Sequence, residues 1–286
     1  MTDLIEDLLH QLTLERLEDN LFRGQSRDLG GKSVFGGQVL GQALLAANQT
    51  IEERASHSLH GYFLRPGDPQ APIIYDVERI RDGRSFATRR VVAIQHGRAI
   101  FNATVSFQSA EDGFDHQLPM PEVPGPEGLR SVIELRRQAA ELLPAERREI
   151  LTRDRPIELR PVQPADLFSP ERREPRQQVW CRAIGTLPDS EALHRAVLAY
   201  ASDFSLLMTA FLPHGLSFYQ PDVIAASIDH AMWFHRPFRA DEWLLYVMDS
   251  PSASFGRGLA HGSIFARDGR LVASVAQEGV MRRRSA

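Results

Sequence analysis

The hydrophobic pattern predicts a buried helix followed by several long strands. Residues 35–47 (Phe-Gly-Gly-Gln-Val-Leu-Gly-Gln-Ala-Leu-Leu-Ala-Ala) are apolar almost all round, which is typical of a helix enclosed on every side. The glycines and alanines of this segment would let the backbone of neighbouring elements approach closely, as suits a helix wrapped by a curved sheet. Strand patterns separated by tight turns then follow at 59–64, 73–80, 85–95 and 99–108.

A second helix and a second set of strands are predicted in the C-terminal half. The helix begins at about Ser190, passes through 196–201 and continues into 204–208, which places Asp203 inside an apolar helical stretch. Two strands are indicated before this helix, at 157–162 and 178–184. Further strands and a tight hairpin follow it, at 228–234, 243–248, 255–265 and 271–280.

Short motifs recur between the two halves. Phe63-Leu64-Arg65-Pro66 is matched 171 residues later by Phe234-His235-Arg236-Pro237, and Gly97-Arg98 is matched 172 residues later by Gly269-Arg270. The order of helix, strands and turns also agrees between the two halves, which indicates a duplication.

These patterns predict an α+β protein with two tandem hotdog domains, a double hotdog in which each antiparallel sheet wraps round a central helix. We expect an N-terminal domain at 1–112, a linker at 113–150 with a charged helical run at 129–150, and a C-terminal domain at 151–286. The two meanders are expected to form one extended sheet.

Composition narrows the classes of partner and compartment. A net charge of −4 gives no bulk attraction to nucleic acid or to an anionic membrane. Cys181 is the only cysteine, so neither an intramolecular disulfide nor a cysteine-rich metal site can form, as fits a reducing compartment. No apolar run approaches the roughly 20 residues that a membrane-spanning helix needs, and residues 2–9 form an acidic amphipathic segment. We expect a cytoplasmic protein without nucleic-acid or membrane partners.

Six segments resemble signature stretches of the acyl-CoA thioesterase II family. The resemblance covers almost the whole chain and is weakest at 113–177. The segments are Leu21-Phe22-Arg23-Gly24-Gln25, Val34-Phe35-Gly36-Gly37-Gln38-Val39, His57-Ser58-Leu59-His60-Gly61-Tyr62-Phe63-Leu64-Arg65-Pro66-Gly67-Asp68, Tyr200-Ala201-Ser202-Asp203-Phe204, Ile228-Asp229-His230-Ala231-Met232-Trp233-Phe234-His235-Arg236-Pro237-Phe238 and Val275-Ala276-Gln277-Glu278-Gly279-Val280-Met281-Arg282.

The resemblance implies hydrolysis of acyl-CoA thioesters without a metal or redox cofactor, by a homo-oligomer that could be a tetramer of chains. In that family a carboxylate, a hydroxyl and a carboxamide hold the attacking water, and the matching positions are Asp203, Ser227 and Gln277. Ser227 departs from the family's usual threonine, because serine keeps the hydroxyl and loses the methyl that stiffens the rotamer. A family histidine matches His57, for which a supporting role at most is expected.

The residue types fit the chemistry that the resemblance implies. Thioester hydrolysis needs a water made nucleophilic and donors placed where charge grows on the carbonyl oxygen. An aspartate can accept a proton, a serine can orient the water, and a glutamine can donate and accept. Asp203 is also an isolated charge in an apolar stretch, which is costly to bury without a reason. Gln277 interrupts the final strand, and its approximate repeat partner in the first meander lies near Phe107. An amide in one copy and an apolar ring in the other indicate one active and one lapsed half.

The same residues bear on other functions. A serine hydrolase would need a Gly-x-Ser-x-Gly elbow, which the chain lacks. Gly31-Lys32-Ser33 resembles the end of a phosphate-binding loop. Such a loop also requires a glycine five residues before Gly31, and this chain has Ser26 there. The histidines 57, 60, 230 and 235 have no acidic or cysteine partner at metal-ligand spacing, so structural roles are expected. A non-catalytic acyl-CoA-binding protein and a hotdog dehydratase stay open, because one fold hosts several chemistries.

Overall fold

A computed structural model describes residues 2–27, 30, 33–140, 145–166, 168 and 170–284. Gly31 and Lys32, which resemble part of a phosphate-binding loop, lie outside these residues. In the described part of the chain, no helix is long and apolar enough to cross a membrane. The helices are α1 (Thr2–Leu12), α2 (Gly36–Asn48), α3 (Val132–Ala140), α4 (Ala145–Thr152), α5 (Glu191–Ser202) and α6 (Met208–Phe211), with 3-10 turns at Pro126–Gly128 and Leu212–His214.

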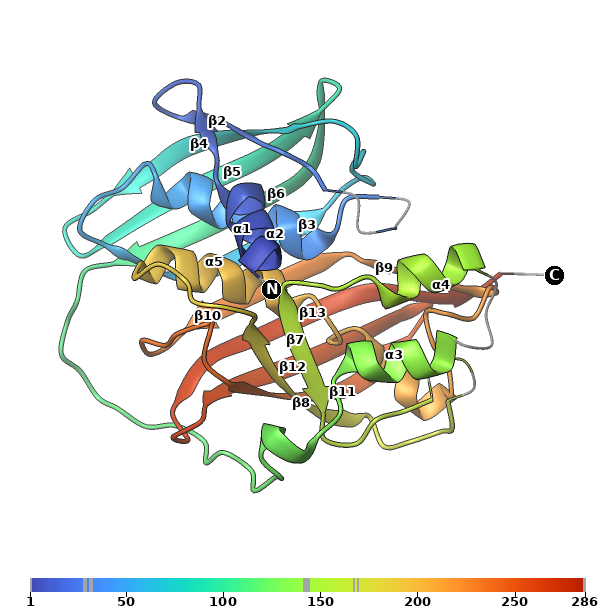
Figure 1. The fold of residues 1–286 in the computed structure, drawn as a ribbon. Helices are drawn as coiled ribbons and strands as arrows, with labels where there is room; N and C mark the ends of the chain where they lie inside the picture. The colour runs from blue at the N-terminus through green and yellow to red at the C-terminus, as the bar shows by residue number, and fades with distance from the viewer. Residues whose placement is uncertain are drawn as a thin grey trace.

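The strands of both halves form one antiparallel sheet, as the repeated meanders predict (Figure 1). Its order over the described residues is β1-β2-β4-β5-β6-β3-β10-β13-β12-β11-β8-β7, and β9 also pairs with β13. The N-terminal strands are β1 (Glu15–Arg16), β2 (Leu21–Gly24), β3 (Ala55–Phe63), β4 (Ile73–Asp82), β5 (Phe86–Gln95) and β6 (Arg98–Gln108). The C-terminal strands are β7 (Ile157–Pro161), β8 (Arg176–Ala183), β9 (Val223–Ser227), β10 (Asp229–Phe234), β11 (Leu244–Ser254), β12 (Arg257–Ala266) and β13 (Leu271–Arg283).

The two halves join through one strand pair and one helix pair. Strand β3 pairs with β10, with Leu59 opposite Met232, so the sheet continues from one half into the other. Helix α2 lies against α5. A Cβ on Gly37 would meet the Tyr200 carbonyl oxygen at 2.3 Å. The glycines of α2 are expected to let neighbouring backbone approach closely. That neighbour is α5, the helix of the other half, as well as the sheet.

Three expected elements differ from the structure. The helix expected through 190–208 is interrupted, because α5 ends at Ser202, Asp203 caps it and Ser205 has a positive φ of 69° that ends the helical path. Asp203 therefore lies at a helix end and not inside a helix. The strand expected at 228–234 is preceded by a second one, β9, and both pair with β13. The charged run at 129–150 contains two helices, α3 and α4, and residues 141–144 between them lie outside the described residues.

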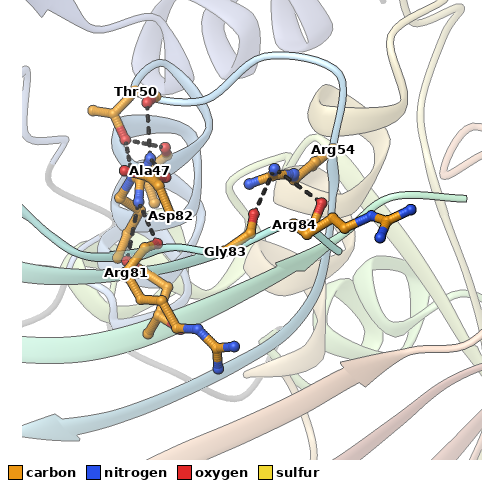
Figure 2. Close-up of polar contacts among 9 residues, drawn as sticks. Ala47, Thr50, Arg54, Arg81, Asp82, Gly83 and Arg84 are labelled. Atoms are coloured by element: carbon orange, nitrogen blue, oxygen red, sulfur yellow. Dashed lines mark hydrogen bonds and ion pairs between the residues drawn. The ribbon is translucent and has the colours of Figure 1, made fainter. Parts of the chain in front are cut away.

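A buried arginine holds the β4–β5 corner onto the end of α2. Arg89 is only 2% exposed. Its guanidinium donates to Thr50 through Nε to Oγ1 at 2.9 Å and through Nη2 to the carbonyl at 3.2 Å, and to Asp82 at 2.6 Å. The carbonyls of Arg81 and Thr88 accept the remaining bonds, each at 3.1 Å. Figure 2 shows Thr50 and Asp82 close together here, with Arg54 donating to the carbonyls of Gly83 and Arg84 beside them.

Candidate active site

The structure brings the three predicted site residues into one hydrogen-bonded cluster. Asp203 is the C-cap of α5, Ser227 is the last residue of β9 and Gln277 lies within β13. Gln277 Nε2 lies 2.7 Å from Asp203 Oδ1 and 3.0 Å from Ser227 Oγ. Ser227 Oγ lies 3.5 Å from the same carboxylate oxygen, so all three side chains meet at one point.

Asp203 also contacts the helix of the other half. The Gly37 N–H, in the first turn of α2, donates to Asp203 Oδ2 at 2.9 Å. Phe35 precedes α2 and supplies no side-chain cap. The Asp203 carboxylate instead accepts from one of the free N–H groups of the first turn of α2. The site is therefore built where the two halves meet. The sequence signal for this contact is Phe35-Gly36-Gly37, whose glycines the sequence pattern explains by packing alone.

Burial governs the acid–base character of Asp203. Loss of solvent raises the pKa of its carboxyl, while the bonds from Gln277, Gly37 and Ser227 act in the opposite direction with smaller effects. The net direction is upward. A carboxylate with a raised pKa is a stronger base than an ordinary aspartate, and Asp203 still opens onto a cavity.

A buried histidine fixes the amide of Gln277. Gln277 is fully buried, and its Nε2 lies 3.2 Å from His230 Nδ1. His230 Nε2 lies 2.9 Å from Ser202 Oγ, which itself donates to the Ala199 carbonyl. Burial lowers the pKa of His230 to about 3, so the ring is neutral. The network assigns the proton to Nε2 and leaves Nδ1 to accept from Gln277. His230 is thus a supporting residue whose role the sequence did not reveal.

His57, the remaining family position, lies outside the cluster. Its Nε2 is 2.9 Å from Ser106 Oγ, and its ring meets the edge of Phe86. Burial, followed by the positive charge of Arg195 and by His60, lowers its pKa. None of its described polar contacts reaches Asp203, Ser227 or Gln277.

Strand register identifies the counterpart of Gln277 in the N-terminal half. Gln277 lies opposite Ala260 in the β12–β13 pair. In the corresponding β5–β6 pair, Arg89 lies opposite Val105. The counterpart is therefore Val105, two residues from the expected Phe107, and it is likewise buried and apolar. An amide in one half and an aliphatic side chain in the other agree with the expected asymmetry.

Two neighbouring cavities open beside the cluster. The smaller has a volume of about 340 Å³ and is lined by Asp203, Ser227 and Gln277 together with apolar side chains such as Leu207 and Val223. The larger has a volume of about 780 Å³. Phe35, Phe218 and the 225–227 segment border both cavities. Ser227 therefore stands at the boundary between the two spaces. Within the described residues, no group of three or more histidine, cysteine or acidic side chains could hold a metal ion.

Comparison with known proteins identifies the family to which the chain is similar. The family model described as "Acyl-CoA thioesterase" matches residues 147–280, and "Acyl-CoA thioesterase N-terminal domain" matches residues 25–108. The chain is 44% identical to "Acyl-CoA thioesterase 2" of Haemophilus influenzae over 99% of both chains. It is also 44% identical to human "Acyl-coenzyme A thioesterase 8", over 95% of this chain and 87% of the human one.

Comparison with solved structures supports the same family and gives the fold. "Acyl-CoA thioesterase II TesB2" of Mycobacterium marinum matches with a TM-score of 0.80 and 44% identity over 98% of both chains. A hot dog protein of unknown function from Alicyclobacillus acidocaldarius matches with a TM-score of 0.76 at 20% identity, covering 96% of this chain and 98% of the other, which shows the fold alone. The predicted double hotdog is confirmed, and the chain belongs to the acyl-CoA thioesterase II family.

Proposed function

We propose that this thioesterase hydrolyses acyl-CoA to a free acid and coenzyme A with a water held by Asp203, Ser227 and Gln277. The family supports the substrate class. The observation that carries the mechanism is the convergence of a basic carboxylate, a hydroxyl and a buried amide on one point of a cavity wall. These three groups can each bond to one water and fix its orientation.

In the first step, Asp203 acts as the general base. The water oxygen attacks the thioester carbonyl carbon while the Asp203 carboxylate takes one of its protons. Ser227 orients the water, and Gln277 positions the carboxylate and the water. The carbonyl oxygen becomes negatively charged in the resulting tetrahedral intermediate.

The second step breaks the carbon–sulfur bond. The negative oxygen re-forms the carbonyl, the sulfur leaves with the bonding electrons, and the proton held by Asp203 passes to the thiolate. The Gly37 N–H at the start of α2 lies beside Asp203, where the positive end of the helix favours negative charge. Donors of this kind stabilise an oxyanion in acyl transfer.

Variants of Ser227 and Gln277 test whether the three residues act as a unit. We expect Ser227→Ala and Gln277→Ala each to lower kcat for acyl-CoA by about tenfold or more, with the double variant well short of the product of the two losses. Ser227→Thr restores the residue usual in the family and should keep most of the activity. Free-thiol release gives the rate.

Ser274→Ala is the matched control, because Ser274 also lies on β13 but bonds to His235 instead of the cluster. It should hydrolyse acyl-CoA at the wild-type rate. Fully multiplicative losses in the double variant would contradict a shared water.

The same assay separates the alternative functions. A dehydratase domain, that of RzxB from Pseudomonas fluorescens, shares the fold at 13% identity and a TM-score of 0.52. A dehydratase would change the acyl chain without releasing thiol, and a binding protein would do neither. Thiol release in proportion to free acid is the result that the proposal requires.

A glycine beside the carboxylate offers a separate test. A Cβ on Gly36 would stand 2.7 Å from Asp203 Oδ2 and 3.0 Å from the Phe63 ring. Gly36→Ala should therefore displace the carboxylate and lower kcat roughly 10- to 100-fold, since small misplacements of catalytic groups are costly. Gly113→Ala is the control, because a Cβ there meets nothing within 4 Å. Wild-type turnover by a folded Gly36→Ala protein would show that the position of Asp203 is not critical.

A further inference from the structure

The larger cavity is lined by positive charge on a protein that is acidic as a whole. Three arginines, Arg65, Arg136 and Arg155, contribute to its wall, and no aspartate or glutamate appears among the described lining residues. The whole chain carries a net charge of −4. A cationic cavity on such a chain indicates a local site for an anion.

Arg136 has no partner in the described structure. It lies on α3, is half-buried, and makes neither a hydrogen bond nor an ion pair with any described residue. Its Nε atom is buried without an acceptor. A buried donor left unsatisfied costs about 1–3 kcal/mol, and more when the group is charged. An acceptor supplied by a ligand would remove that cost.

Arg155 is the second half-buried cation of this wall. It lies between α4 and β7, and its guanidinium carbon is 5.7 Å from the centre of the Phe204 ring. No described carboxylate pairs with it. Burial lowers the pKa of Arg155, and the charge of Arg136 lowers it further, which means that the two guanidiniums are near enough to repel each other. An anion binding between them would reverse this repulsion.

Arginines elsewhere in the same segments are paired. Arg137, next to Arg136 on α3, bonds to Asp154 at 2.8 Å. The repeated motif gives a second comparison, because Arg236 bonds to both a backbone carbonyl and Asp115, whereas Arg65 has only the carbonyl of Ala99, at 2.7 Å. The arginines of the cavity wall therefore lack the carboxylate partner that Arg137 and Arg236 have.

We propose that Arg136 and Arg155, with Arg65 as a third cation, bind the phosphate groups of coenzyme A in the larger cavity. This inference rests on the proposed function, in which acyl-CoA is the substrate. Guanidinium groups match phosphate oxygens in geometry and charge, and coenzyme A carries a pyrophosphate and a 3′-phosphate. The acyl group then occupies the smaller cavity, and Ser227 at the boundary places the thioester next to the water. Both main arginines come from the segment between the two meanders, which would thus bind substrate as well as connect the halves.

Substrates that differ only in their phosphates test this assignment. The same acyl group is presented on coenzyme A, on 3′-dephospho-coenzyme A and on pantetheine, which has no phosphate. Arg136→Gln and Arg155→Gln should each raise KM for acyl-CoA about tenfold with little change in kcat, since a bond to a charged group contributes about 1.5–3 kcal/mol. Neither substitution should alter KM for acyl-pantetheine.

The three substrates also locate the phosphate. An equal loss on the coenzyme A and dephospho forms assigns the arginines to the pyrophosphate, and a loss confined to the coenzyme A form assigns them to the 3′-phosphate. Arg137→Gln is the matched control, because it removes a neighbouring charge that is already paired outside the cavity. It should leave all three KM values unchanged.

Two results would overturn the assignment: unchanged KM for acyl-CoA in both variants, or equal losses on acyl-pantetheine. Calorimetric binding of free coenzyme A to Asp203→Asn protein, with and without the arginine substitutions, gives a second readout that needs no turnover. Weaker binding with the substitutions supports the phosphate site even if Asp203 proves dispensable. Failure of the catalytic proposal and failure of the phosphate site are therefore distinguishable.

Discussion

Asp203→Asn should lower kcat for acyl-CoA hydrolysis by about 10²- to 10⁴-fold, the range lost when a general base is removed. Asparagine keeps the shape of the side chain but cannot take a proton from water. The measurement is free-thiol release at saturating substrate. Asp249→Asn, an exposed change on β11, is the control and should match the wild type. Activity of Asp203→Asn within about threefold of the wild type would leave less than roughly 0.7 kcal/mol to the carboxylate and would end its assignment as base.

Unfolding measurements separate loss of catalysis from loss of folding in Asp203→Asn. Because burial raises the pKa of Asp203, the fold favours its protonated form. Its contribution to stability is therefore present at low pH and is lost as the pH rises through the folded-state pKa. Asparagine does not titrate, so the variant should lack this part of the pH dependence. Denaturant unfolding of the two proteins across the acid range checks this sign.

The pH dependence of the rate follows from the same shift. Wild-type kcat/KM should fall on the acid side as Asp203 becomes protonated, at a pH above that expected for an ordinary aspartate. The residual rate of Asp203→Asn should lack this fall. An identical acid limb in both proteins would assign the titration to another group.

Much of the fold follows from local pattern in the sequence. The all-apolar segment at 35–47 predicts α2, and the alternating segments predict the strands of the meanders. Both follow because the side chains that an element buries set its pattern of apolar positions. The end of α5 was not predictable in this way. It depends on the positive φ of Ser205 and on the bonds that Asp203 makes to Gly37 and Gln277, which come from other parts of the chain.

The candidate site was only partly predictable for a similar reason. Asp203, Ser227 and Gln277 could be selected because their residue types match a family pattern. His230 has the same residue type as histidines with quite different contacts, so only its position beneath Gln277 reveals its role. The arginines of the larger cavity were hidden among many others in the sequence, and only the structure shows that they line one cavity without a carboxylate partner.

The N-terminal half has different side chains at the register positions that correspond to Ala260 and Gln277. At the register position where Ala260 and Gln277 face each other, this half has Arg89 and Val105. The Arg89 guanidinium bonds to Thr50, just beyond the end of α2, much as Gln277 bonds to Asp203 at the end of α5. A structural cation therefore stands at the position of Ala260, the cross-strand neighbour of the amide in the C-terminal half, and the N-terminal half gains a link between helix and sheet.

Arg89→Met should therefore destabilise the fold by about 3 kcal/mol without changing the chemistry. Methionine fills much of the same space but leaves the carbonyls of Thr50, Arg81 and Thr88 without their buried donor, and breaking a buried charged network typically costs 3–5 kcal/mol. Arg89→Lys should recover only part of this, because an ammonium cannot reach all of these acceptors at once. Free energies of unfolding from denaturant titration give the comparison.

Arg90→Met is the matched control on the same strand. Arg90 is exposed and pairs with Glu78 at the surface, where an ion pair contributes at most about 1 kcal/mol. Both variants should keep wild-type kcat well below their unfolding temperatures, since the proposed catalytic groups lie in the other half. If Arg89→Met were no less stable than Arg90→Met, the guanidinium would not hold the β4–β5 corner to α2. If Arg89→Met lost kcat while still folded, the N-terminal position would take part in catalysis, and the view of one active and one structural half would be wrong.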